Sequence, residues 1–525
     1  AAVCEGCGDC SVQANCVSIQ PLETDFGRKR VIDQSSCNKD YSCVKGFCPS
    51  FVTVHGGQLR RPSAVALAGD LFADLPAPIL PVTDGDYSIV VAGIGGTGVV
   101  TIAALLGMAA HMEGKGASVF DMTGLSQKNG AVYSHLWLFD DPTASAPAKI
   151  GLAEADMILG CDLVAAAGAE TMRSVKSGET RAVLNSAVVP TAAFQANPNM
   201  NIDGQMLEMS IGAKVGESNI HVVDASDLAL KLLGNTIGAN TFLIGFALQK
   251  GCIPLSLDAI ERAIELNGVA VDFNLRALSL GRLAAVDIER VQALVPEASR
   301  DGGAKLETLD DVIAHRTAAL VDYQNKEYAA RYTRLVDTVR RADSGLGRDS
   351  DDFAAAVARN AYKVMAYKDE YAVARMFTDG KFERRVAAAF EGDYQLRFHL
   401  SPPLLARRDP VTGEGQKSEF GPWVFRAFKQ LAKMKGLRGT MWDVFGYSAE
   451  RKAERLLRDT YFEDMKRIAG EMTQGSYATA VAIAEIPEQI RGYGHVKHKA
   501  MVEAEAVREN LLAEFVQGRG AEKAA

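Results

Sequence analysis

Apolar and polar positions divide the 525-residue chain into three stretches of different character. Residues 1–60 contain short apolar runs broken by turn-forming residues and no long periodic segment. Residues 86–285 alternate short apolar runs with longer helical stretches. From residue 286 to the end, apolar side chains recur at the spacing of one buried helix face. The pattern predicts a small N-terminal segment, an α/β domain and a mainly helical domain.

Six apolar runs mark the expected strands of the α/β domain. They fall at residues 87–92, 118–120, 132–139, 157–159, 182–184 and 220–223. Strands that alternate with helices form a mostly parallel sheet, because each helix serves as the return crossover. We therefore expect a Rossmann-like domain over residues 86–285 and a helical domain over residues 286–525. Helical spacing is clearest at Leu309, Val312, Ile313, Leu320, Tyr323, Tyr332, Leu335 and Val339.

Composition narrows the class of protein. The net charge of −8 and the pI near 5.7 argue against a nucleic-acid partner, which a basic surface would serve better. No apolar run approaches the ~18 residues of a membrane span, and no secretory signal opens the chain. We expect a cytoplasmic protein. Only three residues precede the first cysteine, so we also expect a larger polypeptide or a partner chain upstream.

Seven of the nine cysteines lie within the first 48 residues. The seven are Cys4, Cys7, Cys10, Cys16, Cys37, Cys43 and Cys48. Two-residue spacings let a tight loop direct several thiolates at one iron–sulfur cluster. Zinc is the weaker alternative, since structural zinc sites use paired C-x2-C elements, and a disulfide framework fits small secreted proteins instead. Cys161 and Cys252 stand alone in apolar surroundings, where we expect them to pack in the core.

The spacing follows two-cluster ferredoxins, in which the fourth cysteine of each run ligates the other cluster. That rule assigns four thiolates to a first [4Fe–4S] cluster: Cys4, Cys7, Cys10 and Cys48. The thiolates left for a second cluster are those of Cys16, Cys37 and Cys43. The first cluster therefore has a complete set of ligands, whereas the second lacks one.

Asp40 stands where the second run would have its middle cysteine, three residues from both Cys37 and Cys43. Three outcomes stay open: the Asp40 carboxylate binds the fourth iron, the second cluster is [3Fe–4S], or only the first cluster exists. A carboxylate is a harder ligand than a thiolate, so an iron bound by Asp40 would be labile and its potential altered. The alternative is that Asp40 is a turn residue with no ligand role.

A glycine-rich turn follows the first expected strand of the α/β domain. Gly93, Gly95 and Gly98 form Gly-x-Gly-x-x-Gly ahead of a helical run. Such a turn offers the free amides of a helix N-terminus to an anion, and Asp121 lies near the position of a ribose-binding acid. Taken alone, the turn predicts a dinucleotide site. Close packing of a strand on a helix requires the same glycines, so the motif leaves both interpretations open.

The segment after this turn resembles the gamma domain of 2-oxoacid:ferredoxin oxidoreductases. The likeness is carried by TGLSQKNGAVYSH at residues 123–135, NTFLIG at residues 240–245 and the stretch at residues 274–282. The chain as a whole resembles the latter half of the fused indolepyruvate ferredoxin oxidoreductases, with a ferredoxin-like segment, a gamma domain and a helical domain. In the helical domain the similar blocks are FHLSPP at 398–403, GLRGT at 436–440, DVFG at 443–446 and RGYGH at 491–495.

The resemblance implies oxidative decarboxylation of an aryl-2-oxoacid such as indolepyruvate to an aryl-acetyl-CoA, with reduction of ferredoxin. Thiamine diphosphate with Mg²⁺ would act on upstream domains or a partner subunit, because this chain has no Gly-Asp-Gly motif of the thiamine-binding type. This half would supply the electron relay and part of a CoA site, with Ser126 and Asn129 as the expected polar contacts. The resemblance also implies an oligomer.

Two other functions remain open at this point. One is an NAD(P)-linked iron–sulfur oxidoreductase that uses the turn at residues 93–98. The other is a non-catalytic interaction subunit whose cluster only stabilises the N-terminal fold. Among single residues, Arg438 is interpreted as a salt bridge at a domain junction in preference to a phosphate ligand. His495 and His498 are interpreted as part of a basic surface in preference to a metal site.

Overall fold

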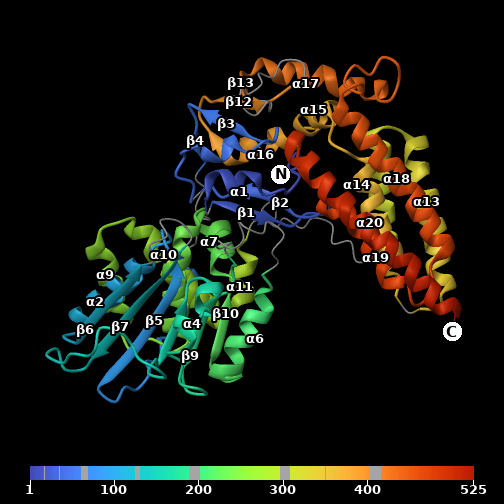
Figure 1. The fold of residues 1–525 in the computed structure, drawn as a ribbon. Coiled ribbons are helices and arrows are strands. Elements are labelled where there is room, and N and C mark those ends of the chain that lie inside the picture. Colours follow the sequence, from blue (N-terminus) through green and yellow to red (C-terminus); the bar gives the residue numbers. More distant parts are fainter. Residues whose placement is uncertain are drawn as a thin grey trace.

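The computed structural model describes residues 1–16, 18–34, 36–60, 69–123, 130–188, 202–295, 308–348, 350–402 and 416–524. Two bodies are visible in Figure 1: an α/β domain, and a second body in which the cysteine-rich segment packs against the helical region. Among the described helices, none has the length and apolar composition needed to cross a membrane.

The α/β domain is built on a six-stranded sheet with strand order β10-β9-β8-β5-β7-β6. Its strands are β5 (Asp86–Ile94), β6 (Gly116–Thr123), β7 (Ala131–Phe139), β8 (Met157–Gly160), β9 (Arg181–Asn185) and β10 (Ile220–Val223). Strands β5, β8, β9 and β10 pair in parallel, while β7 runs antiparallel between β5 and β6. All six expected strands and the mostly parallel sheet are confirmed.

Helices cover both faces of this sheet. They are α2 (Val99–Met112), α3 (Leu163–Ala166), α4 (Ala169–Met172), α6 (Gly204–Val215), α7 (Ala225–Leu233), α8 (Ala239–Gln249), α9 (Leu257–Asn267), α10 (Val271–Val286) and α11 (Ile288–Ala293). Helices α8 and α10 touch backbone to backbone: a Cβ at Gly281 would overlap the carbonyl oxygen of Phe242, and one at Gly245 the carbonyl of Leu278. Cys161 and Cys252 are buried in the core, as expected.

The cysteine-rich segment contains short elements joined by loops. They are α1 (Asp9–Ala14), β1 (Ile19–Leu22), β2 (Lys29–Ile32), the 3₁₀ turn η1 (Ser42–Lys45), β3 (Val52–His55) and β4 (Gln58–Leu59). Strands β1 and β2 form an antiparallel hairpin. A segment with so little apolar core of its own needs a partner surface, and the helical region provides it.

The helical region buries the apolar face that its spacing predicts. Its helices are α12 (Leu309–Tyr323), α13 (Lys326–Gly345), α14 (Asp352–Met365), α15 (Glu370–Thr378), α16 (Lys381–Ala389), α17 (Trp423–Lys433), α18 (Ala449–Glu471), α19 (Tyr477–Glu485) and α20 (Gly494–Ala524). Leu320, Tyr332 and Val339 are fully buried in one core shared by α12, α13, α14, α18 and α19.

Three strands of the helical region form two small sheets with strands of the cysteine-rich segment, which the sequence pattern did not predict. They are β11 (Phe390–Glu391), β12 (Gln395–Leu400) and β13 (Ser418–Phe420). Strand β12 pairs antiparallel with β3 and β13, and β11 pairs with β4. The ranges 1–60 and 286–525, expected as separate domains, therefore share strand pairing and form one body (Figure 1). Periodicity is a local signal and carries no information about such distant pairing.

Candidate iron–sulfur centre

Four of the seven N-terminal cysteines are electrostatic neighbours in the fold. They are Cys4, Cys7 and Cys10, from the loop before α1 and from α1 itself, and Cys48, from the loop after η1. Burial raises the pKa of the Cys7 thiol to about 12, and the neighbouring Cys48 and Cys4 raise it further. Burial also raises the pKa of Cys10, whose electrostatic neighbours are Cys48, Cys4 and Cys7. Buried cysteines this close together stay deprotonated only if a nearby positive charge stabilises the thiolates. Bound iron would supply that charge.

Backbone and hydroxyl groups already point at two of these sulfurs. The N–H groups of Gly6 and Arg30 donate to Cys4 Sγ at 3.2 and 3.3 Å. Cys48 Sγ lies 2.9 Å from Ser50 Oγ. Hydrogen bonds to sulfur stabilise a thiolate ligand and tune the potential of a cluster. Cys4, Cys7, Cys10 and Cys48 therefore fit the donor set expected of the first four-iron site.

The remaining three cysteines gather in a second group. Burial raises the pKa of the Cys43 thiol to about 11, and its electrostatic neighbours are Cys37, Cys16 and Asp40. The N–H of Lys39 donates to Cys37 Sγ at 3.4 Å. These electrostatic neighbours divide the cysteines as the ferredoxin spacing rule does, with Asp40 near the second set, while the ligand assignment itself stays a prediction.

Asp40 performs the turn role that the sequence left as an alternative. Its Oδ1 accepts hydrogen bonds from the N–H and the hydroxyl of Ser42 at 3.0 and 2.8 Å. The turn is tight, since Lys39 and Tyr41 on either side have φ of 60° and 57°. Oδ2 receives a long hydrogen bond of 3.4 Å from Asn38, and the side chain is exposed. Ligation through Oδ2 stays a prediction.

Within the described ranges, no three or more His, Cys, Asp and Glu side chains close on a single metal ion. Ligation by the seven cysteines and Asp40 likewise remains a prediction that rests on residue type, spacing and grouping.

The helical region places a cation beside the two cysteine groups. Lys417 Nζ donates to the carbonyl oxygens of Val44 and Gly46, at 2.7 and 2.5 Å, in the loop that joins Cys43 to Cys48. Its electrostatic neighbours are Cys48, Asp9, Cys10 and Cys43, which belong to both groups. Sequence reasoning missed Lys417, because no local pattern links it to a loop more than 370 residues away.

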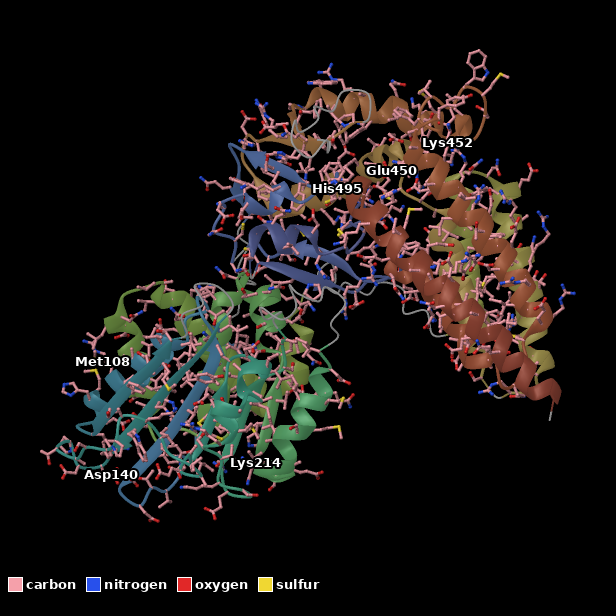
Figure 2. All side chains as sticks on the ribbon, viewed as in Figure 1. Met108, Asp140, Lys214, Glu450, Lys452 and His495 are labelled. Carbon is pink, nitrogen blue, oxygen red and sulfur yellow. The ribbon has the colours of Figure 1, made fainter. Side chains whose placement is uncertain are left out.

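The start of α20 packs on the same loop. Gly494 has a φ of +52°, and a Cβ there would overlap the ring of Phe47, the residue before Cys48. The His495 ring, labelled in Figure 2, lies 4.7 Å from the Phe47 ring, so His495 packs against the loop. The hydroxyl of Tyr493 donates to the carbonyl of Val3 next to Cys4.

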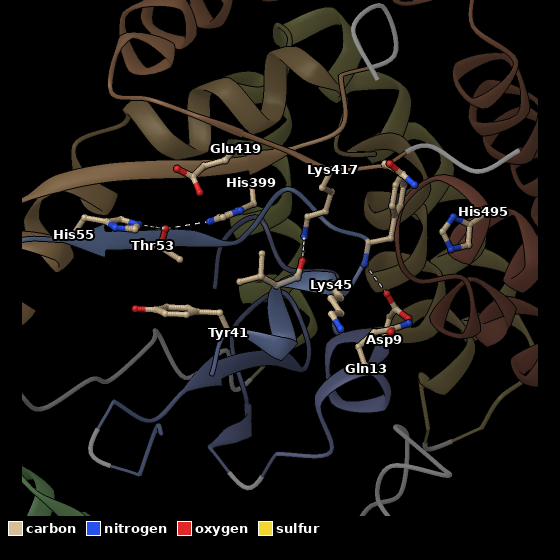
Figure 3. A pocket seen from close by; sticks show the side chains of 13 residues that line it. Asp9, Gln13, Tyr41, Lys45, Thr53, His55, His399, Lys417, Glu419 and His495 are labelled. Carbon is tan, nitrogen blue, oxygen red and sulfur yellow. Dashed lines mark hydrogen bonds between the residues drawn. The ribbon is translucent and has the colours of Figure 1, made fainter. Parts of the chain in front are cut away.

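A cavity of about 590 Å³ opens beside the second cysteine group. Figure 3 shows its lining, in which Tyr41 and Lys45 flank Cys43 and Lys417 closes one wall. Thr53 Oγ1 on β3 lies 3.0 Å from His55 Nε2 and 3.1 Å from His399 Nε2 on β12. Burial lowers the pKa of His399, so this histidine is neutral near pH 7. The cavity therefore has polar groups close to the second cysteine group.

The glycine-rich turn serves packing in this fold. A Cβ at Gly93 would lie 2.5 Å from Val99 Cγ2 and 3.1 Å from Cys161 Cβ. Gly98 has a φ of +90° and precedes α2 without a side-chain cap. Asn240 Nδ2 donates to the carbonyl of Thr97 at 2.7 Å, which places α8 against the turn. Gly95 donates to the carbonyl of Gly130, next to the segment of Ser126 and Asn129, which lies outside the described residues.

The position of Asp121 argues against a dinucleotide site. In the dinucleotide fold, the ribose-binding acid ends the strand next to the glycine-bearing strand. Here β7 lies between β5 and β6, so Asp121 on β6 is two strands away from the turn. Its Oδ1 accepts a hydrogen bond from the hydroxyl of Ser134 on β7. The NAD alternative therefore loses its second supporting residue.

Arg438 forms a salt bridge as predicted, but inside the helical region and not at a domain junction. Its Nε and Nη2 donate to the two carboxylate oxygens of Asp369 at 2.5 and 2.9 Å, and its Nη1 donates to the carbonyl of Tyr323. Both charged side chains are 4% exposed. The pair fastens the start of α15 to the end of α12, so Arg438 is a structural residue.

Comparison with known proteins identifies the family. A model for pyruvate ferredoxin/flavodoxin oxidoreductase matches residues 88–284. The indolepyruvate oxidoreductase subunit IorB of Pyrococcus horikoshii is 30% identical over 206 residues, which is 39% of this chain and 98% of the relative. The chain belongs to the family of indolepyruvate oxidoreductase IorB subunits. The IorB of Thermococcus kodakarensis is 29% identical over 211 residues, 39% of this chain and 98% of that protein.

The IorB family falls in the general class of 2-oxoacid:ferredoxin oxidoreductases. Among solved structures, the PORC subunit of pyruvate oxidoreductase from Thermotoga maritima is 22% identical, covering 38% of this chain and 96% of its own, with a TM-score of 0.28. A gamma subunit of a keto/oxoacid ferredoxin oxidoreductase from Geobacter sulfurreducens is 19% identical, covering 38% and 98%, with a TM-score of 0.27.

A second family model, for a family of unknown function (DUF6537), matches residues 309–510 of this IorB-family chain. Neither model reaches residues 4–48, where the seven cysteines lie. The contacts of Lys417 and Gly494 therefore connect a domain without an assigned role to the cysteine-rich segment.

Proposed function

We propose that this chain is the electron-transfer and gamma-domain part of a thiamine-diphosphate-dependent indolepyruvate (aryl-2-oxoacid):ferredoxin oxidoreductase. The reaction would convert the oxoacid and CoA to aryl-acetyl-CoA and carbon dioxide, with electrons delivered to ferredoxin. The observation that supports the proposal is the run of seven cysteines in an IorB-family chain, whose electrostatic neighbours fall into two sets.

Cys4, Cys7, Cys10 and Cys48 would hold the first [4Fe–4S] cluster. The second cluster, [4Fe–4S] or [3Fe–4S], would use Cys16, Cys37 and Cys43, with Asp40 in the former case. Each cluster supplies a one-electron carrier when bound. The chain's own groups would set its potential. Amides of Gly6 and Arg30 donate to the Cys4 sulfur, and the ammonium of Lys417 near both cysteine groups favours the more negative, reduced state.

Several parts of this proposal lie outside the chain's described residues. Thiamine diphosphate with Mg²⁺ would reside on upstream domains or a partner subunit, ferredoxin would accept the electrons, and the assembly would be an oligomer. Ser126 and Asn129, next to the turn at Gly93, Gly95 and Gly98, would contribute to a CoA site. The names of the IorB relatives support indolepyruvate as the substrate class.

The test is substrate-driven bleaching of the visible cluster absorption in the native complex, purified without oxygen. Indolepyruvate and CoA together should bleach the absorption and reduce added ferredoxin, and omission of CoA should abolish steady turnover. In the Cys10→Ser complex this response should be lost. A Cys252→Ser complex is the matched control, since Cys252 is buried in the α/β core, away from both groups. Failure of every oxoacid tried to bleach the wild-type complex would refute the proposal.

A further inference from the structure

A larger cavity lies between the cysteine-rich segment and the helical region, on a different side from the cavity of Figure 3. Its volume is about 1800 Å³. The β1–β2 hairpin forms one wall, and helices α12, α14 and α16 form much of the other. Pockets for small ligands are commonly about 300–1,000 Å³, so this one has room for a ligand of nucleotide size.

The lining of this cavity is basic in an acidic protein. Twelve Lys and Arg residues and eight Asp and Glu residues line it, whereas the whole chain has 57 basic and 65 acidic residues. The local excess of positive charge reverses the balance of the chain. A concave surface with an excess of positive side chains focuses a positive electrostatic potential, which attracts anions.

Several of these cations lack a carboxylate partner. Among the described residues, Lys29, Lys363, Arg384 and Arg385 have no carboxylate within 4 Å. Lys29 is only 9% exposed, while Arg384 and Arg385 stand exposed at the mouth on α16. Burial lowers the pKa of Lys29 to about 8 and that of Lys363 to about 7. Burying unpaired ammonium groups is costly, which indicates that a counter-charge belongs here.

The nearest carboxylate is already shared. Glu5 forms an ion pair with Lys368 at 2.6 Å. Lys29 and Lys497 also lie near Glu5, and Lys497 forms its own ion pair with Glu454 at 2.5 Å. Glu5 is thus committed to Lys368, which leaves Lys29 without a carboxylate within 4 Å among the described residues.

An aromatic ring also lines the cavity. The Arg316 guanidinium lies 4.3 Å from the centre of the Phe26 ring and 4.8 Å from that of Tyr362, and its Nε and Nη1 have no hydrogen-bond partner among the described residues. The His315 ring also contacts Phe26, at 5.1 Å between centres. Phe26 is nevertheless 41% exposed. A ring held firmly and left partly open offers a stacking face to a planar group.

We propose that this cavity binds a nucleotide that carries two or more phosphate groups, with the phosphates at Lys29 and Lys363 and the base on Phe26. Phosphates supply the missing counter-charge, and the base uses the exposed ring. Arg384 and Arg385 at the mouth raise the local concentration of the anion. The inference goes beyond the proposed function and does not depend on it.

The experiment is calorimetric titration of the purified chain, or of its native complex, with ADP, ATP, CoA and tripolyphosphate. ADP should bind saturably, and tripolyphosphate should compete with it. Lys363→Met should weaken both at least tenfold, and Arg385→Met should weaken both several-fold. Phe26→Leu should weaken ADP while leaving tripolyphosphate unchanged. Lys452→Met is the control, because Lys452 is exposed on α18 and does not line the cavity (Figure 2).

The variants can be interpreted because Lys363→Met removes a partly buried charge and Arg385 is exposed, so both should fold. Absence of saturable ADP binding, or binding unaffected by Lys363→Met and Arg385→Met, would overturn the inference and favour an acidic protein segment as the occupant. An equal effect of Phe26→Leu on ADP and tripolyphosphate would also contradict it. Tighter CoA than ADP binding would support the site and identify its nucleotide as the acyl acceptor. Substrate bleaching tests the proposed function separately.

Discussion

Gly494 is the position where a single methyl group should disturb the first cysteine group most directly. The residue opens α20 with a φ of +52°, and its N–H donates to Glu450 Oε1 at 3.0 Å. An added Cβ would overlap the ring of Phe47. The backbone N–H of Phe47 donates to Asp9 Oδ2 at 2.6 Å. Phe47 is bonded to Cys48, so displacing the ring moves a predicted cluster ligand.

The cost of Gly494→Ala has two parts. A left-handed backbone conformation costs a non-glycine residue about 1–2 kcal/mol. Forcing an extra methyl into a packed contact adds about 1–3 kcal/mol, because the ring and its loop must shift. The free energy of unfolding of the body formed by the cysteine-rich segment and the helical region should therefore fall by about 2–5 kcal/mol. At about 2–4 °C per kcal/mol for units of this size, the midpoint should drop on the order of 10 °C.

Thermal unfolding and iron content should be measured together under anaerobic conditions. Gly494→Ala should lower the midpoint and release iron, while the α/β domain keeps its stability. Gly470→Ala is the matched control: it lies inside α18, an added Cβ there would meet no atom within 4 Å, and helix propensity predicts a gain of up to about 1 kcal/mol. A Gly494→Ala protein with unchanged midpoint and iron would refute the reasoning that α20 supports the Cys48 loop.

Three further outcomes are expected. Lys417→Gln should make a cluster potential more negative by some tens of millivolts in an EPR redox titration, because a nearby positive charge is lost. Lys429→Gln, which removes an exposed cation on α17, should leave the potential unchanged. Equal potentials in the wild type and Lys417→Gln would exclude an electrostatic effect of Lys417 on the cluster. Arg438→Met should cost about 3–5 kcal/mol in denaturant unfolding, because Asp369 is left buried without its partner, and a loss below about 1 kcal/mol would contradict this. Gly281→Ala should destabilise the α/β domain by about 1–3 kcal/mol or more, measured by its thermal midpoint; full stability would mean that α8 and α10 are free to separate.

The strands of the α/β domain were predictable because each is a local apolar run. Residues 220–223, for example, are predicted and observed as β10. The two cysteine groups were predictable for a similar reason, since ligand spacing in a ferredoxin-like loop is a short-range pattern. Cys48, far from Cys4 in sequence, is an electrostatic neighbour of Cys10, as the spacing rule requires, while its ligation stays a prediction.

What the sequence could not predict depends on contacts between distant residues. The pairing of β12 with β3, the position of Lys417 over the cysteine loop and the contact of Gly494 with Phe47 each join residues hundreds of positions apart. At the glycine-rich turn, by contrast, a local pattern suggested a binding site that the fold does not support. Its local pattern matches a dinucleotide motif, yet Gly93 is required by the side chain of Val99, and strand order separates Asp121 from the turn.

The central claim is that the cysteine-rich segment carries redox-active iron–sulfur clusters. The most direct measurement is metal analysis with EPR of the complex, purified without oxygen, as isolated and after reduction. The account predicts at least about four irons per chain and a cluster signal that changes on reduction; about eight irons would favour Asp40 ligation, about seven a three-iron site and about four a single cluster. Zinc in place of iron, or a cluster that does not change its redox state, would contradict the account.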